Sequence, residues 1–318
     1  ATDVNGSDRV YVGDNDFNPP SAGRTATVDQ TLAGPTGFAP QRIESRATSG
    51  QDLPPIRTAI GPNNIVYAAF VARRGAGANS EVVVTRDDAG GAGATPYRAL
   101  LDTDNNPGIR VATGLTVPFE NSSHANFGQE RLVASDLSIA VHPTDAARVC
   151  VAWGDRRSNT VLTLHLRCST DSGGTWTAGA GANGDILTHD NAKAPALGFN
   201  SAGVLGFLSQ HFVVSGTDRR WVTHFERLAP NFALLTDTVL ATTPANTPAV
   251  TFIPYLGDYV HLMAVGETFY GIFSANNTPD RNNFPAGVSY QRRVDFTAET
   301  LMDLAGNPVA ASIDPFFF

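Results

Sequence analysis

Short apolar segments separated by polar turns recur along the whole chain, and this pattern predicts strands in place of helices. Four segments share one plan, in which a short strand leads through a turn containing Asn, Gly or Pro into a second apolar strand. Alternation combined with such turn chemistry predicts a β-hairpin. The four hairpins are IRTAIGPNNIVYAAFV (56–71), LSIAVHPTDAARVCVAW (137–153), PALGFNSAGVLGFLSQ (195–210) and YVHLMAVGETFYGIFS (259–274).

Each hairpin is followed by a polar loop and a third predicted strand, and a weaker fourth strand usually follows. The third strands are SEVVVTRDD (80–88), TVLTLHLRCST (160–170), RRWVTHFER (219–227) and GVSYQRRVDF (287–296). The clearest fourth strands are TPYRALLD (95–102) and DTVLATTPA (237–245). Four antiparallel strands per repeat are typical of a β-propeller blade. We therefore expect an all-β propeller forming one domain over 1–318.

The N-terminal segment enters this pattern out of phase. DRVYVGDNDF (8–17) matches a second strand and is followed by third and fourth strands, so the innermost strand is missing. Two explanations remain open: SIDPFFF (312–318) completes this blade, or an upstream segment has been removed. Five blades are detectable and the pattern allows a sixth. The segment 101–135 lacks clear alternation and is predicted to be an inserted loop, a kind of segment that often carries function.

Composition narrows the class of protein. The 318 residues are 42% hydrophobic and 16% charged, with 30 Gly and 20 Pro, which is too apolar for a disordered chain and too rich in turn formers for a helical bundle. The net charge of −8 argues against nucleic acid as a partner. No apolar run is long enough for a membrane span, and the first residues show neither an initiator Met nor a signal peptide. We expect a processed, soluble protein.

The two cysteines fall on neighbouring predicted strands. Cys150 lies on the second strand of its blade and Cys168 on the third, and the pair is centred on the connecting loop. Opposed cysteines on adjacent antiparallel strands favour a disulfide, although two buried thiols are the alternative. A disulfide implies an oxidising compartment, so we expect a protein that is secreted or displayed on the cell surface.

A specific motif follows the second cysteine directly. It has the spacing S-x-D-x-G-x-T-W of the bacterial neuraminidase repeat, or Asp box, formed by Ser169, Asp171, Gly173, Thr175 and Trp176. A degraded copy, TRDDAGG (85–91), occupies the same turn one blade earlier. We expect a structural role, in which the aspartate accepts backbone hydrogen bonds and the glycine adopts a positive φ.

Through these residues the chain resembles the sialidase-like, Asp-box β-propeller superfamily. The resemblance implies the fold, and it implies a glycan or glycoconjugate as the partner. Members include exo-sialidases, other glycoside hydrolases and lyases, and non-catalytic binding proteins, so the fold alone does not select an activity. The expected function is a secreted, bacterial-type exo-glycosidase of the exo-α-sialidase kind. The alternative is a non-catalytic glycan-binding, surface interaction or assembly propeller of undetermined oligomeric state.

The candidate site residues lie in the loops that are expected to open on the channel face of a propeller. Sialidases of the family hold the sugar carboxylate with arginines, activate a tyrosine nucleophile with a glutamate and use an aspartate as acid/base. The matching catalytic candidates are Arg57, Asp136, Arg156, Glu226, Tyr255 and Asp258, with Glu44 as a second candidate base. The candidate ligand-binding residues are Arg73, Asp155, Arg157, Gln210, Asn276 and Arg292. For each, a polar loop or a turn cap is the alternative interpretation.

Metal sites have weaker sequence support. Asp14, Asp16 and Asn18 alternate like calcium ligands, as do Asp102, Asp104 and Asn106, but both sets lack the glycine and the distal glutamate of an EF-hand. They predict at most a structural calcium ion. The histidines show no zinc spacing, so no cofactor is expected to be required.

Overall fold

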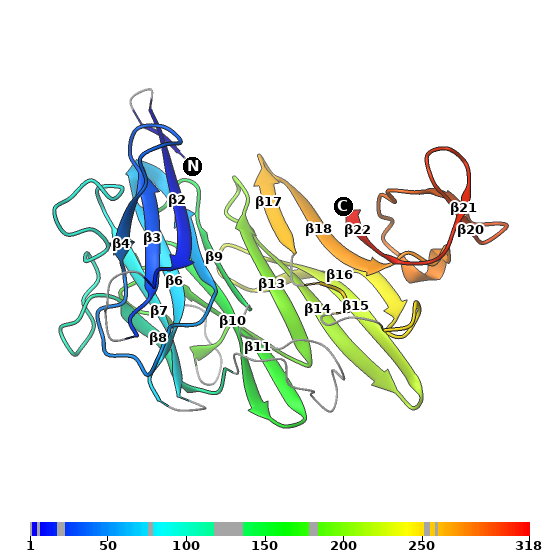
Figure 1. The fold of residues 1–318 in the computed structure, drawn as a ribbon, viewed down its shortest axis with the longest axis horizontal. Helices are drawn as coiled ribbons and strands as arrows, with labels where there is room; N and C mark the ends of the chain where they lie inside the picture. The colour runs from blue at the N-terminus through cyan, green and yellow to red at the C-terminus, as the bar shows by residue number, and fades with distance from the viewer. Residues whose placement is uncertain are drawn as a thin grey trace. The chain divides into compact units, whose positions relative to one another are not determined.

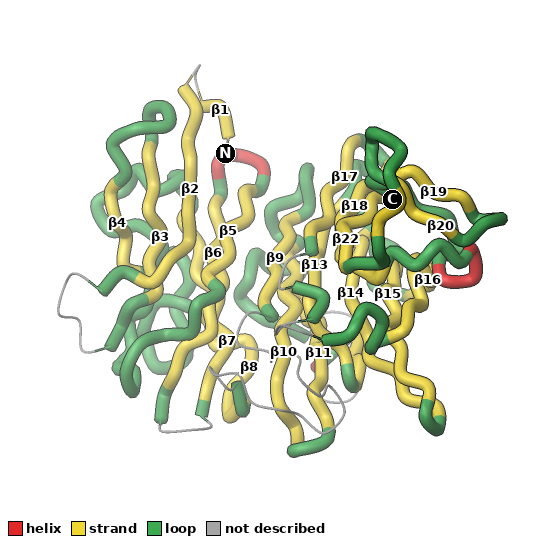
Figure 2. The backbone as a smooth tube through the Cα atoms, turned by 45° about the vertical axis from the view of Figure 1, so that its right-hand side comes forward, coloured by secondary structure: helices red, strands yellow, loops and turns green. Residues whose placement is uncertain are grey.

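The computed structural model describes residues 2–4, 7–17, 23–75, 79–117, 136–177, 184–250, 255–257 and 260–318. Strands and loops make up almost all of this part of the chain (Figure 2). Two single 3-10 turns are described in full, η1 (Pro62–Asn64) and η3 (Arg281–Asn283). The all-β fold class predicted from the alternation is confirmed. No helix in the described ranges is long and apolar enough to cross a membrane.

The chain divides into two compact units. The first consists of Ala1–Phe119, Val133–Arg156 and His165–Thr188, and the second of Glu120–Leu132, Arg157–Leu164 and His189–Phe318. The division passes through one of the sheets, the one whose strands lie between residues 137 and 190.

Three four-stranded sheets are each formed by four consecutive strands of the chain. The first two lie in the first unit, and the third spans the division. The first contains β1 (Thr2–Val4), β2 (Ser7–Asn15), β3 (Ala26–Thr31) and β4 (Ala39–Arg42). The second contains β5 (Ile56–Ile60), β6 (Val66–Arg73), β7 (Ser80–Asp87) and β8 (Ile109–Leu115). The third contains β9 (Leu137–Val141), β10 (Val149–Ser158), β11 (Val161–Ser169) and β12 (Leu187–Asp190). This consecutive order is that of a propeller blade, as the repeats predict.

The core of the first unit lies between its sheets. Strand β6 is buried along nearly its whole length, which explains its continuous apolar run, since both of its faces are covered. Gly13 on β2 approaches the neighbouring sheet so closely that a Cβ atom there would clash with the carbonyl oxygen of Ile56. Only glycine permits this approach of two backbones.

The predicted disulfide is confirmed. Cys150 on β10 and Cys168 on β11 are bonded, with their Cα atoms 4.0 Å apart, and both side chains are fully buried. Directly after β11, the Oδ1 atom of Asp171 accepts hydrogen bonds from the Ser169 hydroxyl (2.7 Å) and the Thr175 amide (2.8 Å). The indole of Trp176 donates to the carbonyl of Gly173, which has φ +85°. These bonds close the turn of the Asp-box sequence.

The related turn after β7 is also organised by an aspartate. The carboxylate of Asp87 accepts hydrogen bonds from the amides of Ala89, Gly91 and Tyr97. The segment 95–102, expected to be the fourth strand, forms turns instead, and Ile109–Leu115 takes that place as β8. Because the hydrogen bonds to Asp87 hold the following residues in a turn, the fourth strand begins later in the sequence, at Ile109. Strand β8 falls inside the range 101–135 expected to be a loop, and 118–135 lies outside the described residues.

The second unit contains a further four-stranded sheet, a three-stranded sheet and a small sheet (Figure 1). The four-stranded sheet is formed by β13 (Ala192–Phe199), β14 (Leu205–Ser215), β15 (Asp218–Leu228) and β16 (Leu234–Pro244). The three-stranded sheet has the order β17 (His261–Val265), β18 (Thr268–Asn276) and β22 (Ile313–Phe317). The small sheet is formed by β19 (Arg293–Asp295), β20 (Thr300–Met302) and β21 (Pro308–Val309).

The third strand of the last blade differs from the prediction. The segment 287–296 was expected to pair with β18, but β22 occupies that place, as Figure 1 shows for the red strand beside the orange one. Of the two explanations left open for the N-terminal blade, the one in which SIDPFFF completes it is therefore wrong; β1 pairs with β2 there. Aromatic packing explains the choice, because Phe316 and Phe273 are both fully buried and stack with ring centroids 5.9 Å apart.

Candidate functional site

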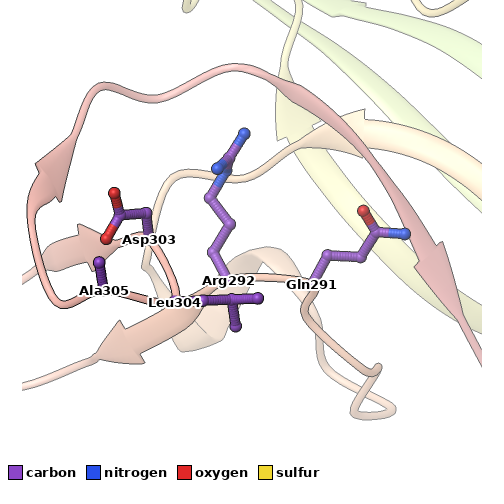
Figure 3. A pocket seen from close by; sticks show the side chains of 5 residues that line it. All are labelled: Gln291, Arg292, Asp303, Leu304 and Ala305. Carbon is purple, nitrogen blue, oxygen red and sulfur yellow. The ribbon is translucent and has the colours of Figure 1, made fainter.

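A hollow of about 460 Å³ lies in the second unit, in the segment between β18 and β22. Its lining residues are Gln291 and Arg292, just before β19, and Asp303, Leu304 and Ala305, in the turn between β20 and β21. In Figure 3 the side chain of Arg292 projects between those of Gln291 and Asp303. The hollow thus places one cation and one anion beside an exposed apolar side chain, since Leu304 is 79% exposed.

Among the described residues, the hydrogen bond of Arg292 is made by one end of its guanidinium group. Its Nε atom donates to Oδ2 of Asp314 at 3.0 Å, and the side chain is 37% exposed. The same oxygen accepts from Nδ2 of Asn277 (2.7 Å), and Oδ1 accepts from the hydroxyl of Ser312 (2.7 Å). Asp314 therefore receives three hydrogen bonds, one of them from the fully buried Asn277. This network fixes the direction of Arg292 and directs the rest of its fork toward the hollow.

Asp303 is the one acidic residue among the five that line the hollow. Its oxygens accept from the side-chain amide of Asn307 (3.0 Å) and from the backbone amide of the same residue (2.9 Å). These two hydrogen bonds lower the pKa of Asp303 below its ordinary value, so it remains a carboxylate. It is suited to accept hydrogen bonds from hydroxyl groups and not to donate a proton.

The predicted catalytic residues of the second unit have other partners. Tyr255 is buried, and its hydroxyl donates to the carbonyl oxygen of Pro248 at 2.9 Å. Glu226 is also buried and pairs with His189, with Oε2 and Nε2 2.7 Å apart. These contacts therefore do not pair Tyr255 with Glu226. Asp258 lies outside the described residues.

Three predicted ligand-binding residues of the second unit are also accounted for. Gln210 is buried and donates to the carbonyl oxygen of Ser274 at 2.8 Å. Asn276 is fully buried, and its Oδ1 atom accepts from the amide of Thr278. Arg157 is exposed at the start of the second unit, 4.0 Å from a carboxylate. Of the ligand-binding candidates in this unit, Arg292 alone lines the described hollow.

The candidates of the first unit are spread over several strands. Arg57 is exposed on β5, while Arg73 at the end of β6 and Arg156 near the end of β10 are half-buried. Asp136 is buried at the start of β9, where its carbonyl oxygen accepts from the amide of Gly154. In these contacts, no candidate acid lies beside a candidate nucleophile.

Asp155 belongs to a compact ionic group on β10 and β11. Its Oδ1 atom lies 3.2 Å from Nε2 of His165, whose Nδ1 atom is 3.0 Å from Oδ2 of Asp185. Burial opposes protonation of His165, but the hydrogen bonds to the two carboxylates outweigh it and raise the pKa of the imidazole. The ring also stacks on the buried Trp153, with centroids 5.1 Å apart. Both ring nitrogens are engaged within the protein.

Glu44, the second candidate base, is enclosed in the first unit. Its carboxylate accepts from the amide of Arg46 (2.7 Å) and pairs with Nη1 of Arg74 (2.9 Å), which also pairs with Glu81. Burial raises the pKa of Glu44 to about 7, against the lowering effect of Arg74. Because its side chain has no exposed surface, this group is an internal ion pair and not an accessible base.

The predicted calcium loops contain arginine contacts. Asp16 pairs with Arg42 at 3.3 Å, and burial together with Asp29 and Asp16 raises the pKa of Asp14. Asn18 lies outside the described residues. In the second loop, Asp102 pairs with the guanidinium groups of Arg46 and Arg110. Within the described ranges, no group of three or more His, Cys, Asp or Glu side chains is arranged to hold a metal ion.

Sequence reasoning missed a column of histidines in the second unit. His189 on β12, His211 on β14 and His224 on β15 lie ring beside ring, with centroids 4.8 and 4.3 Å apart. The signal was present in the hairpin of β14 and β15. Ser215 pairs with Asp218 across its turn, and counting back along both strands puts His211 and His224 on one face.

Comparisons with known proteins find only distant likenesses. No protein family matches the chain, and no curated protein is a significant match. The α-L-arabinanase of Penicillium chrysogenum aligns with 96% of this chain over 89% of its own length, at 11% identity and a TM-score of 0.46. The polysaccharide lyase Uly1 aligns with 95% of this chain over 70% of its own, at 10% identity and a TM-score of 0.42. A protein of unknown function from Dyadobacter fermentans covers 83% of this chain and 68% of its own, at 14% identity and a TM-score of 0.42. These values are too low to assign an activity or a family.

Proposed function

We propose that this protein binds a glycan bearing a carboxylate group, through the hollow around Arg292. The observation that carries the proposal is the mounting of that arginine. Asp314 holds one edge of the guanidinium group, and the side chain remains partly exposed at the hollow. A planar arginine fork recognises a carboxylate through two parallel hydrogen bonds.

The other lining residues fit the remainder of such a ligand. Asp303 stays ionised and can accept hydrogen bonds from sugar hydroxyls, while Leu304 offers apolar surface to the C–H groups of a sugar ring. The negative charge of Asp303, which lines the hollow together with Arg292, also disfavours ligands that carry several anionic groups. Recognition of one carboxylate amid hydroxyls is what a sugar acid requires.

Hydrolysis of such a glycan by an exo-glycosidase of the sialidase type is a second candidate function. The observation that favours it is the hydrogen-bonded turn at Asp171, with a similar turn at Asp87 one sheet earlier. Its catalytic residues would come from the channel-face candidates, such as Arg57 and Asp136. The disulfide supports a secreted or surface location, because such bonds persist in oxidising compartments.

Binding is tested by titrating the purified protein with three oligosaccharides: a sialylated one, one containing a uronic acid and a neutral one. We expect the two acidic ligands to bind and Arg292→Ala to weaken them at least tenfold, the effect of losing a charged hydrogen bond of about 1.5–3 kcal/mol. Arg293→Ala is the matched control, since Arg293 is an exposed neighbour of equal charge. Equal binding of the neutral ligand, or equal loss in both variants, contradicts the proposal.

Hydrolysis is tested separately with 4-methylumbelliferyl α-sialoside between acidic and neutral pH. Release that Arg57→Ala abolishes would support the exo-sialidase. Release no higher than the blank, together with retained binding, would leave a glycan-binding protein.

A further inference from the structure

A pocket of about 500 Å³ lies in the first unit, beside β3 and β4. One wall comes from the loop after β3 and from the start of β4, and the other from the glycine-rich turn 91–96. We name it the glutamine pocket, after Gln30 and Gln41, which line it. Because it belongs to the unit that does not contain Arg292, its ligand is independent of the proposed glycan site.

The two glutamines share one face of their sheet. Gln30 on β3 pairs with Ala39 on β4, and Gln41 follows two residues later, so all three side chains point to the same face. Gln30 is 4% exposed, and its carboxamide donates to the carbonyl oxygen of Gly91 (2.8 Å) and accepts from the hydroxyl of Tyr97 (3.2 Å). The half-buried carboxamide of Gln41 has no hydrogen bond with any described residue. It is therefore available to a ligand.

The opposite wall is fixed before a ligand arrives. The carboxylate of Asp87 accepts from the amide of Gly91 (2.6 Å), and the hydroxyl of Tyr11 donates to the carbonyl oxygen of Gly90 (2.9 Å). A Cβ atom at Gly91 would clash with the carboxamide of Gln30, so glycine is required at this close approach. Binding at this wall consequently costs little conformational entropy of the protein.

Both walls combine amide groups with small apolar groups. Residues 91–94 are Gly-Ala-Gly-Ala, and the last three are exposed, so a ligand can reach their peptide groups. A carboxamide likewise carries a C=O acceptor and N–H donors side by side. Apolar side chains lie among these amides, including Leu32 and Pro96. A peptide has the same composition, with one amide group and one side chain in each residue.

The charge of the pocket narrows the kind of peptide. The described residues that line it are all uncharged. A charged side chain buried there would lose its hydration and find no counter-charge, which costs free energy. The pocket therefore favours a peptide without charges.

The backbone of β4 disfavours an added strand. Strand β4 is at the edge of its sheet (Figure 2). The amide of Ile43 donates to the carbonyl oxygen of Ala26, so the alternation of an antiparallel pair turns the backbone of Pro40 away from β3. Proline has no N–H to pair with a further strand. A polyproline II segment does not need such an edge, because its peptide groups are free to bond with side chains.

We propose that the glutamine pocket binds an uncharged, extended peptide segment of a partner protein, rich in alanine and proline. The carboxamide of Gln41 and the peptide groups of residues 91–94 bond to the backbone of this segment. Its small apolar side chains contact Leu32 and Pro96.

The test is isothermal titration calorimetry of the whole protein with an octapeptide of alternating alanine and proline, blocked by acetyl and amide groups. We expect saturable binding at one site. Two further peptides replace two alanines by aspartate or by lysine, and both should bind more weakly. The net charge of −8 by itself would favour the lysine peptide. Tighter binding of that peptide, or no binding of the alanine–proline peptide, overturns the proposal.

Two variants test the walls separately. Gln41→Ala should weaken the peptide about threefold to tenfold, the effect of one hydrogen bond between neutral groups. Gly93→Val should weaken it about tenfold or more by filling part of the pocket. Gly93 has no positive φ, and a Cβ atom there meets only the amide nitrogen of Thr95, at 4.0 Å, so this variant should fold. Gln51→Ala is the matched control, because Gln51 is a half-buried glutamine of the same unit outside the pocket. Unchanged affinity in either pocket variant, or an equal loss in the control, overturns the proposal.

The same titrations separate this proposal from the glycan site. Arg292→Ala should leave the affinity for the peptide unchanged, and Gln41→Ala should leave the affinity for acidic oligosaccharides unchanged, since the two residues lie in different units. A neutral oligosaccharide is the remaining comparison. If it binds, if Gln41→Ala weakens it and if the peptide does not bind, the pocket takes a sugar and the proposal is overturned.

Discussion

Reduction of the disulfide between Cys150 and Cys168 should lower the free energy of unfolding of the first unit by about 3 kcal/mol. The two residues are 18 apart in sequence, so the bond closes a loop of that length in the unfolded chain. The chain-entropy relation gives about 11 cal/mol/K for such a loop, or about 3 kcal/mol at 25 °C. Both side chains are fully buried, and reduction leaves them in place, so no cavity adds to this value.

The assay is equilibrium urea denaturation of the protein with and without dithiothreitol, in a Trp221→Phe background. The remaining tryptophans, Trp153 and Trp176, both lie in the first unit and report its transition. The control is the double alanine variant at both cysteines, whose midpoint should not respond to reductant. Coinciding midpoints of oxidised and reduced protein, with two free thiols found by titration, would refute the reasoning. A steeper slope for the reduced form is expected, since its unfolded chain exposes more surface.

Three further predictions concern the first unit. Gly13→Ala should cost about 1–3 kcal/mol of unfolding free energy, because the new Cβ meets the backbone of β5, and an unchanged urea midpoint would contradict the close approach. Asp171→Ala should cost about 0.5–1.5 kcal/mol, the net contribution of a hydrogen bond, because water can replace the carboxylate at the exposed donors of Thr175; calorimetry can measure this cost, which should vanish as pH falls well below 3.8. Because the pKa of His165 is raised, its contribution to the free energy of unfolding is complete below pH 6.5 and is lost as pH rises through the folded-state pKa. The stability difference between wild type and His165→Gln should therefore shrink from pH 6 to pH 9. A difference that grows with pH would contradict the favourable coupling of His165 with Asp155 and Asp185.

Much of the local structure could be predicted from the sequence. Alternation of apolar and polar residues, with Gly and Asn at the turns, is a short-range signal that fixes each hairpin and its strand order. The cysteine pair was predictable for the same reason, because both residues lie in one hairpin. Asp171 was recognised from spacing alone, and its hydrogen bonds involve only residues within four positions of it.

Long-range pairing was not predictable in this way. The partner of β18 is chosen by burial of Phe316 against Phe273, across a segment that contains its own alternating stretch. Arg292 was named as a candidate from its position, but its mounting by Asp314 and Asn277 depends on three segments meeting. In the histidine column, the hairpin of β14 and β15 places His211 and His224 on one face, but the position of His189 beside them depends on the placement of β12, which no local pattern supplies.

The hollow is built entirely from a segment inserted between two strands that pair with each other. Strands β18 and β22 are hydrogen-bonded neighbours, and Asn277 and Ser312 close the base of the insertion by exchanging backbone and side-chain hydrogen bonds. The residues between them can therefore change in length and sequence while the sheet keeps its register. Recognition and scaffold are separable in this part of the molecule, so evolution could replace the ligand preference, and an engineer could graft another one, without redesigning the blade.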